Sequence, residues 1–139
     1  MRAIMNGLDL KRAISPQAAR TDNTAIVSTV ADLLGYGGAM LAINIGANTD
    51  ADVTFTVLIE DSPDDSTYTA VADAYLNGTE ALAGFTFADD NELRKIGYVG
   101  NERYLRATIT PADNAAGNIF VSAEWVLAPN RVAAANPPA

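Results

Sequence analysis

The chain has 139 residues, of which 49% are hydrophobic, and a formal net charge of −8 at neutral pH. This length suits one domain with its own hydrophobic core. The chain contains neither cysteine nor histidine, which excludes disulfides, zinc sites built on those residues and Ser-His-Asp triads. We therefore expect a protein that is not an enzyme and that needs no cofactor.

Charge is distributed unevenly along the chain. Residues 21–93 carry thirteen Asp and Glu and no Lys or Arg, whereas the basic residues lie in 1–20 and 94–139. Such an acidic block repels phosphates, so we expect no nucleic-acid partner. No apolar run approaches the roughly 18–20 residues that a bilayer span needs, and the first residues lack the apolar stretch of a secretory signal. We expect a soluble, unexported protein without a membrane partner.

The first twenty residues, "MRAIMNGLDLKRAISPQAAR", do not form a clear element. Asn6-Gly7 and Ser15-Pro16 interrupt any helix there. The end of the chain is small, proline-containing and without periodicity. These features predict an extended N-terminal arm over 1–20, a domain over 21–129 and a C-terminal tail over 130–139.

Strand signals dominate between the two ends. Short alternating or β-branched runs bounded by turn residues predict strands at 25–30, 39–46, 52–60, 66–73, 102–110 and 118–128. The inward faces are predicted to hold Val53, Phe55, Val57 and Ile59, then Leu105, Ala107 and Ile109, then Ile119, Val121, Ala123, Trp125 and Leu127. Together these strands predict an all-β fold, an antiparallel β-sandwich or a jelly-roll-like small barrel.

Two connections between these strands differ in character. The stretch "PADNAAGN" between the last two strands contains Gly and Asn and predicts a hairpin connection. Residues 73–93 predict a long loop with a turn at Asn77-Gly78 and a short strand near "GFTFA".

The acidic turn that contains Asp61, Asp64 and Asp65 offers the oxygen ligands that calcium prefers. Its spacing does not match the helix-flanked calcium loop, so we interpret it as a solvated turn. No pair of carboxylates is selected for glycoside hydrolysis. The aromatic residues Tyr68, Tyr98 and Tyr104 could stack on a sugar, although covering a sheet face is the more usual role of such side chains.

The stretch "RKIGYVGNERYLRATIT" combines Gly97 and Gly100 with several basic residues. A glycine loop that binds phosphate normally opens a helix, whereas alternation follows here. We therefore predict a turn that feeds a strand, with the glycines at positive φ. Arg103 and Arg106 have opposite parity on this strand and are candidates for salt bridges to the acidic block or to a partner.

The segments "LLGYGGAMLAINIG", "FTVLIEDSPDDSTYTAVAD", "KIGYVGNERYLRATIT" and "VSAEWVLAPNR" together resemble a family of small structural proteins of tailed bacteriophages. The resemblance covers about residues 24–131. Its most specific part is Gly97-Tyr98-x-Gly100-x-x-Arg103-Tyr104-x-Arg106.

This resemblance implies a non-enzymatic virion protein, similar to capsid decoration or cement proteins, that binds and stabilises the shell of the major capsid protein. It implies a homo-oligomer, in particular a trimer, made in the host cytoplasm and placed on the outer surface of the capsid. The alternatives are a head-tail joining or tail-associated protein, or a carbohydrate-binding module for host surface glycans. The residues expected to contact the capsid or a second copy are Arg2, Ile4, Met5, Leu8, Leu10, Lys11, Arg12, Arg103 and Arg106.

Overall fold

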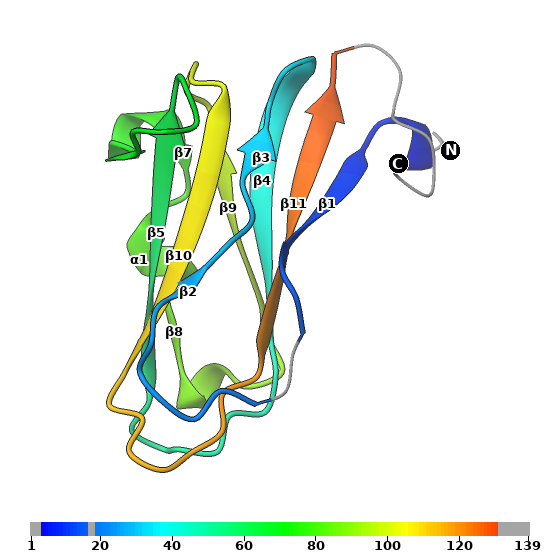
Figure 1. The fold of residues 1–139 in the computed structure, drawn as a ribbon. Helices are drawn as coiled ribbons and strands as arrows, with labels where there is room; N and C mark the ends of the chain where they lie inside the picture. The colour runs from blue at the N-terminus through cyan, green and yellow to red at the C-terminus, as the bar shows by residue number, and fades with distance from the viewer. Residues whose placement is uncertain (1–3, 17–18, 131–139) are drawn as a thin grey trace.

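The computed structural model describes residues 4–16 and 19–130, which form two antiparallel β-sheets packed face to face (Figure 1). The first sheet has five strands in the spatial order β1 (Asp9–Ile14), β11 (Val121–Pro129), β4 (Tyr36–Ile45), β9 (Leu93–Tyr98) and β7 (Leu76–Asn77). The second sheet follows the order β2 (Ile26–Val27), β10 (Tyr104–Ala112), β5 (Thr54–Ser62) and β6 (Thr69–Ala70). In addition, β3 (Ala31–Asp32) pairs with β10, and β8 (Phe85–Thr86) pairs with β5. The expected antiparallel β-sandwich is confirmed.

The core lies between the sheets and follows the alternation of the sequence. Successive side chains of a strand point to opposite faces, so every second residue of β5, β10 and β11 turns inward. All inward residues predicted for these strands are buried, and Leu105, Ala107, Ile109, Ala123 and Leu127 have no exposed surface at all. Trp125, the largest of them, is a core residue as expected.

The strands at 25–30 and 66–73 are much shorter than predicted. They contribute only the two-residue strands β2 and β6. The segment 73–93 holds the one-turn helix α1 (Glu80–Ala83), the 3-10 helices η2 (Asp73–Tyr75) and η3 (Phe87–Asp89), and strands β7 and β8. The predicted turn at Asn77-Gly78 is confirmed, with Gly78 at a φ of +97°.

The predicted hairpin between the last two strands is wrong. β10 belongs to one sheet and β11 to the other, so residues 113–120 cross between the sheets. Asp50 supports the crossing, because its carboxylate accepts hydrogen bonds from the amides of Ala115 and Ala116 at 2.8 and 3.3 Å. Glycine and asparagine mark a turn, but they do not specify which strands pair on either side of it.

The explanation predicted for Gly97 and Gly100 is also wrong. Neither has a positive φ, and Gly97 lies inside β9. The side chain of Tyr98 folds back over Gly100, so an added Cβ there would lie 2.4 Å from the Tyr98 ring and hydroxyl. Gly100 is therefore required by a close approach of a side chain and not by backbone conformation.

The expected N-terminal arm is replaced in part by a strand. Residues 9–14 form β1, which pairs with β11 at the edge of the five-stranded sheet. Pairing satisfies the backbone groups of β1 that face β11, and the strand buries Ala13 and Ile14, which an arm would leave exposed. Further on, Arg20 forms an isolated bridge with Ile119. The tail expected over 130–139 lies outside the described residues except for Asn130.

We predict that Leu105→Ala will lower the free energy of unfolding by about 2–5 kcal/mol, because it opens a cavity in a fully buried site of β10. The matched control is Leu58→Ala on the outer face of the same sheet, where the side chain is 36% exposed, with an expected cost below about 1 kcal/mol. Urea denaturation of the two variants measures both values. Equal losses would contradict the assigned inward and outward faces.

Candidate partner-binding surface

Most residues expected to contact a partner gather at one edge of the sandwich. The 3-10 helix η1 (Ile4–Asn6) precedes β1, and its Ile4 and Met5 are 73% and 65% exposed. Leu8 and Leu10 are exposed as well. Since β1 ends the five-stranded sheet, one of its edges is not paired with another strand. The combination of an edge strand and exposed apolar side chains is typical of an interaction surface.

The inward side of β1 is charged. Asp9 and Lys11 lie across from the core residues Leu127 and Trp125, so both face the rim of the core. The hydroxyl of Tyr36 donates to Asp9, and the ammonium of Lys11 lies 5.0 Å from the Tyr36 ring centre. The hydrogen bond to Asp9 and burial raise the pKa of Tyr36 to about 12. Inward charges on an edge strand disfavour pairing with a foreign strand, which leaves side-chain contacts as the mode of binding.

Arg103 lies at the same end of the molecule as β1. Its Nε and Nη2 atoms donate to the two carboxylate oxygens of Asp32 at 2.8 and 2.7 Å. This bidentate contact is the main cause that lowers the pKa of Asp32 to about 2, and the charge of Lys11 contributes. A groove of about 570 Å³ beside this pair is lined by residues 33–39, which run into β4, and by residues 98–103, which run from the end of β9. Arg103 therefore meets the acidic block within its own chain.

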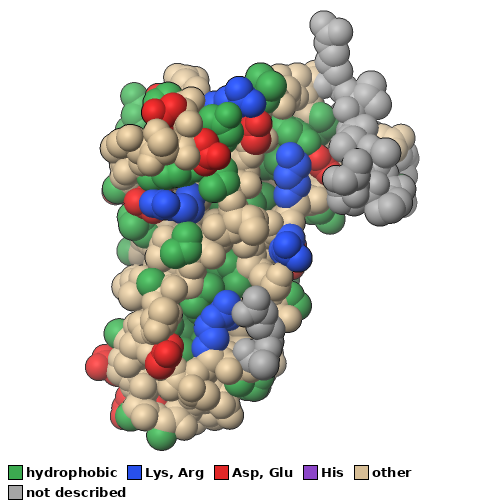
Figure 2. Space-filling model, in the orientation of Figure 1, with side chains coloured by type: hydrophobic (Ala, Val, Ile, Leu, Met, Phe, Trp, Pro, Cys, Tyr) green, Lys and Arg blue, Asp and Glu red, His purple; other side chains and the backbone are tan. Residues whose placement is uncertain are grey.

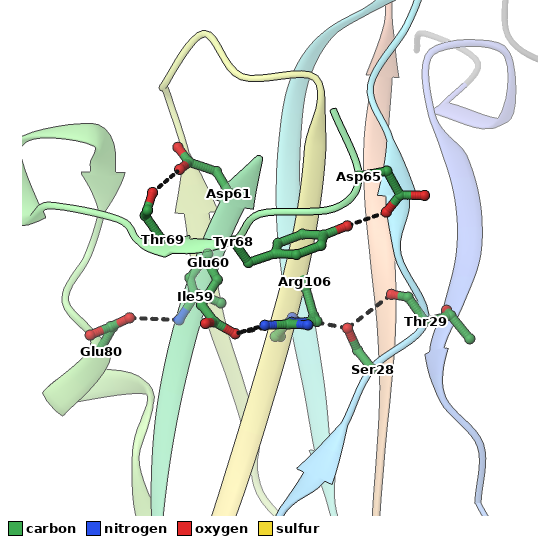
Figure 3. Close-up of polar contacts among 11 residues, drawn as sticks. Ser28, Thr29, Ile59, Glu60, Asp61, Asp65, Tyr68, Thr69, Glu80 and Arg106 are labelled. Carbon is green, nitrogen blue, oxygen red and sulfur yellow. Dashed lines mark hydrogen bonds and ion pairs between the residues drawn. The ribbon is translucent and has the colours of Figure 1, made fainter. Parts of the chain in front are cut away.

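Arg106 lies on a different surface. It points outward from the second sheet, where its Nε and Nη2 donate to one oxygen of Glu60 at 3.0 and 2.8 Å (Figure 3). The guanidinium covers the Tyr68 ring at 4.1 Å, and the Tyr68 hydroxyl donates to Asp65. Arg106 thus belongs to the second sheet whereas β1 belongs to the first, and Arg106 and Arg103 pair with different acidic residues. Arg2 lies outside the described residues.

The tyrosines considered for sugar stacking are engaged by the protein itself. Tyr98 is buried, and its hydroxyl donates to Asp61 at 2.8 Å. One face of the Tyr68 ring is covered by Arg106, and one face of the Tyr104 ring by Arg103 at 4.8 Å. These contacts do not favour a sugar platform at the three tyrosines.

The acidic turn closes on itself through Asp64. This carboxylate accepts hydrogen bonds from the amides of Ser66 and Thr67 at 3.0 and 3.1 Å, which hold the pKa of Asp64 well below its usual range. The side chain of Asp64 thus forms an Asx turn. Within residues 4–16 and 19–130, no three acidic side chains are arranged to hold a metal ion.

One further surface escaped the sequence analysis. The outer side of the five-stranded sheet carries small and apolar residues on its central strands, including Gly38, Met40 and Ala42 of β4 and Val126 of β11. These positions alternate with buried ones, so the signal was present within each strand. Only the strand order shows that they are neighbours.

Comparisons with known proteins show similar folds but do not assign the chain to a family. No family model matches the chain, and no curated protein matches it. Solved structures with a similar fold include VP2 in the infectious bursal disease virus subviral particle, with a TM-score of 0.53, 12% identity and coverage of 86% of this chain but 31% of VP2. Others are the C-terminal domain of a chitobiase from Bacteroides fragilis (TM-score 0.44, 16% identity, 80% of this chain and 66% of that one) and Xyl-CBM35 in complex with a glucuronic acid containing disaccharide (TM-score 0.46, 12% identity, 98% of both).

These solved structures share at most 16% identity with the chain. At such low identity they show the fold alone. In the part of the chain that the structure describes, no helix has the length and apolar character to cross a membrane.

We predict that Arg103→Ala will move the pKa of Asp32 from about 2 back toward 3.8, because the variant removes the main cause of the shift. A carboxyl group with a lowered pKa stabilises the fold above its ordinary pKa and loses this effect as the pH falls through the lowered value. Stability should therefore fall less between pH 3.8 and 2 in the variant than in the wild type. Carbon NMR titration of the Asp32 carboxyl measures the shift, and unchanged titration in the variant would contradict the assigned pair.

Proposed function

We propose that this chain is a non-enzymatic structural protein of a virion, a capsid decoration or cement protein of a tailed bacteriophage that binds the outer surface of the major capsid protein shell. The observation that carries the proposal is the set of exposed apolar side chains beside the edge strand β1, namely Ile4, Met5, Leu8 and Leu10. Exposed apolar residues that cluster within a short segment mark a surface that a partner covers. The family resemblance of the sequence points to the capsid as that partner.

Charge at this edge supports the same partner surface. Lys11 and Arg12 belong to β1, and Arg20 follows within the same N-terminal segment. Figure 2 shows Lys and Arg side chains spaced down the side of the molecule where β1 lies. In a chain with a net charge of −8, this basic edge has the opposite sign to the rest of the protein and orients it toward an acidic surface. Copies bound at many sites on one shell stabilise it through many contacts at once.

We predict that a chain lacking residues 1–8 will bind shells of its cognate capsid protein at least about tenfold more weakly than the full chain, because the exposed apolar residues before β1 are removed. Co-sedimentation with purified shells measures the affinity. The double variant Leu8→Ser with Leu10→Ser tests the same surface should the truncated chain fail to fold.

The control for this test is Arg106→Ala on the opposite sheet, which should bind shells like the wild type. Cryo-EM of decorated shells provides the second measurement, and density at symmetric sites across the shell is expected. Full binding by the truncated chain would refute the contact surface. Density confined to the neck or tail would favour a head-tail joining or tail-associated protein, and binding to glycans without binding to shells would favour a carbohydrate-binding module.

A further inference from the structure

The outer side of the five-stranded sheet carries two neighbouring rows of side chains, which we call the flat face. The pairing register places one residue from each of four adjacent strands in each row. The first row is apolar and consists of Leu10, Val126, Met40 and Gly97. The second row is charged and consists of Arg12, Glu124, Ala42 and Lys95. The small residues Gly97 and Ala42 keep this surface flat, because neither residue has a side chain that protrudes far from the sheet.

The flat face is open in the described chain. The single helix, α1, packs against β5 and β9 and not across β4 and β11. Pro16 and Arg20 border the face only at its end, where they line a small groove with Ser122. Leu10 is 57% exposed and Lys95 is exposed as well, so these positions of the flat face are accessible to a partner.

Among the described residues, Lys95 and Glu124 of the flat face form no salt bridge, although Arg12 lies across from Glu124 on the neighbouring strand. The salt bridges of the described chain are made by Arg94, Arg103 and Arg106. On the second sheet, by contrast, Glu60 and Tyr68 neutralise and cover Arg106. A face that combines apolar residues with unpaired charges of both signs suits a partner with the complementary arrangement.

We propose that this partner is a second copy of the chain, bound face to face about a two-fold axis that runs along β4. β11 and β9 flank β4 on its two sides, so the axis brings each of these strands opposite the other in the second copy. Glu124 then lies opposite Lys95 of the second copy, and the same pair forms again by symmetry. In the apolar row, Met40 lies against Met40 of the second copy, and Val126 lies against its Gly97.

In this arrangement the charges of one copy are therefore complementary to those of the second copy. Packed sheets approach to about 10 Å, which the small residues Ala42 and Gly97 allow. Four strands at roughly 4.8 Å spacing and two rows about 7 Å apart give an interface on the order of 300 Å² per copy. That area is smaller than in most specific complexes, so we expect weak association, with dissociation constants of about 10–100 µM or higher. The contact closes at two copies and not at the three that the family resemblance implies.

This inference goes beyond the proposed capsid role and does not depend on it, because the test uses the purified chain alone. Sedimentation velocity from about 5 to about 200 µM should show the wild type passing from monomer to dimer. Lys95→Glu and Glu124→Lys each place like charges opposite one another twice, and each variant should weaken association about tenfold or more. An equimolar mixture of the two variants restores both opposite-charge pairs and should dimerise at least as well as the wild type.

The matched control is Thr110→Glu, which adds a negative charge at an exposed position of the second sheet and should dimerise like the wild type. Thermal unfolding of each variant confirms that it is folded. A wild type that stays monomeric throughout the range would overturn the proposal. So would single variants that associate like the wild type, or a mixture that remains monomeric.

Discussion

The arrangement of both sheets depends on the hydrogen bonds of a two-residue segment between β2 and β3 (Figure 3). The backbone amide of Ser28 donates to the carbonyl of Ala107 at 2.8 Å, and the Ser28 hydroxyl accepts from the Ala107 amide at 2.9 Å. The next residue, Thr29, turns to the other sheet, where its amide donates to Ala13 and its carbonyl accepts from the indole of Trp125 at 3.1 Å. Because buried polar groups need partners, these bonds hold the two sheets in one relative position.

The same segment fixes the position of the strand that carries the candidate partner-binding surface. Thr29 bonds the backbone of β1 at Arg12 and Ala13, and this contact fixes the last residues of the edge strand. With β1 fixed, Asp9 and Lys11 face inward and Leu10 faces outward. Leu10 is therefore presented from a paired strand, and Ile4 and Met5 from the 3-10 helix η1 that precedes it, and not from the arm that the sequence suggested. Presentation from a rigid element lowers the conformational entropy that binding would cost.

Sequence alternation predicted the inward faces of β5, β10 and β11 because these strands bury one face and expose the other. It failed at β1, where the charged residues Asp9 and Lys11 face inward and break the apolar period that marks a strand. The apolar and basic residues near the N-terminus were found from composition, but the acidic partners of Arg103 and Arg106, which are Asp32 and Glu60, follow from contacts that only the fold creates. The flat face was missed for the same reason, since its neighbours lie far apart in the sequence.

The two outer faces of the sandwich differ in their charges: those on the second sheet are paired within the described chain, and those on the first sheet are not. On the second sheet the Arg106 guanidinium is held by Glu60 and Tyr68, so little charge remains for a partner. On the first sheet Lys95 and Glu124 remain unpaired within the described chain. Two copies joined about an axis along β4 would carry their β1 edges on opposite sides of the pair, because β1 lies at one end of the strand order. With the proposed shell as partner, such a pair would engage two shell sites at once, which raises its effective concentration at the second site without any new contact.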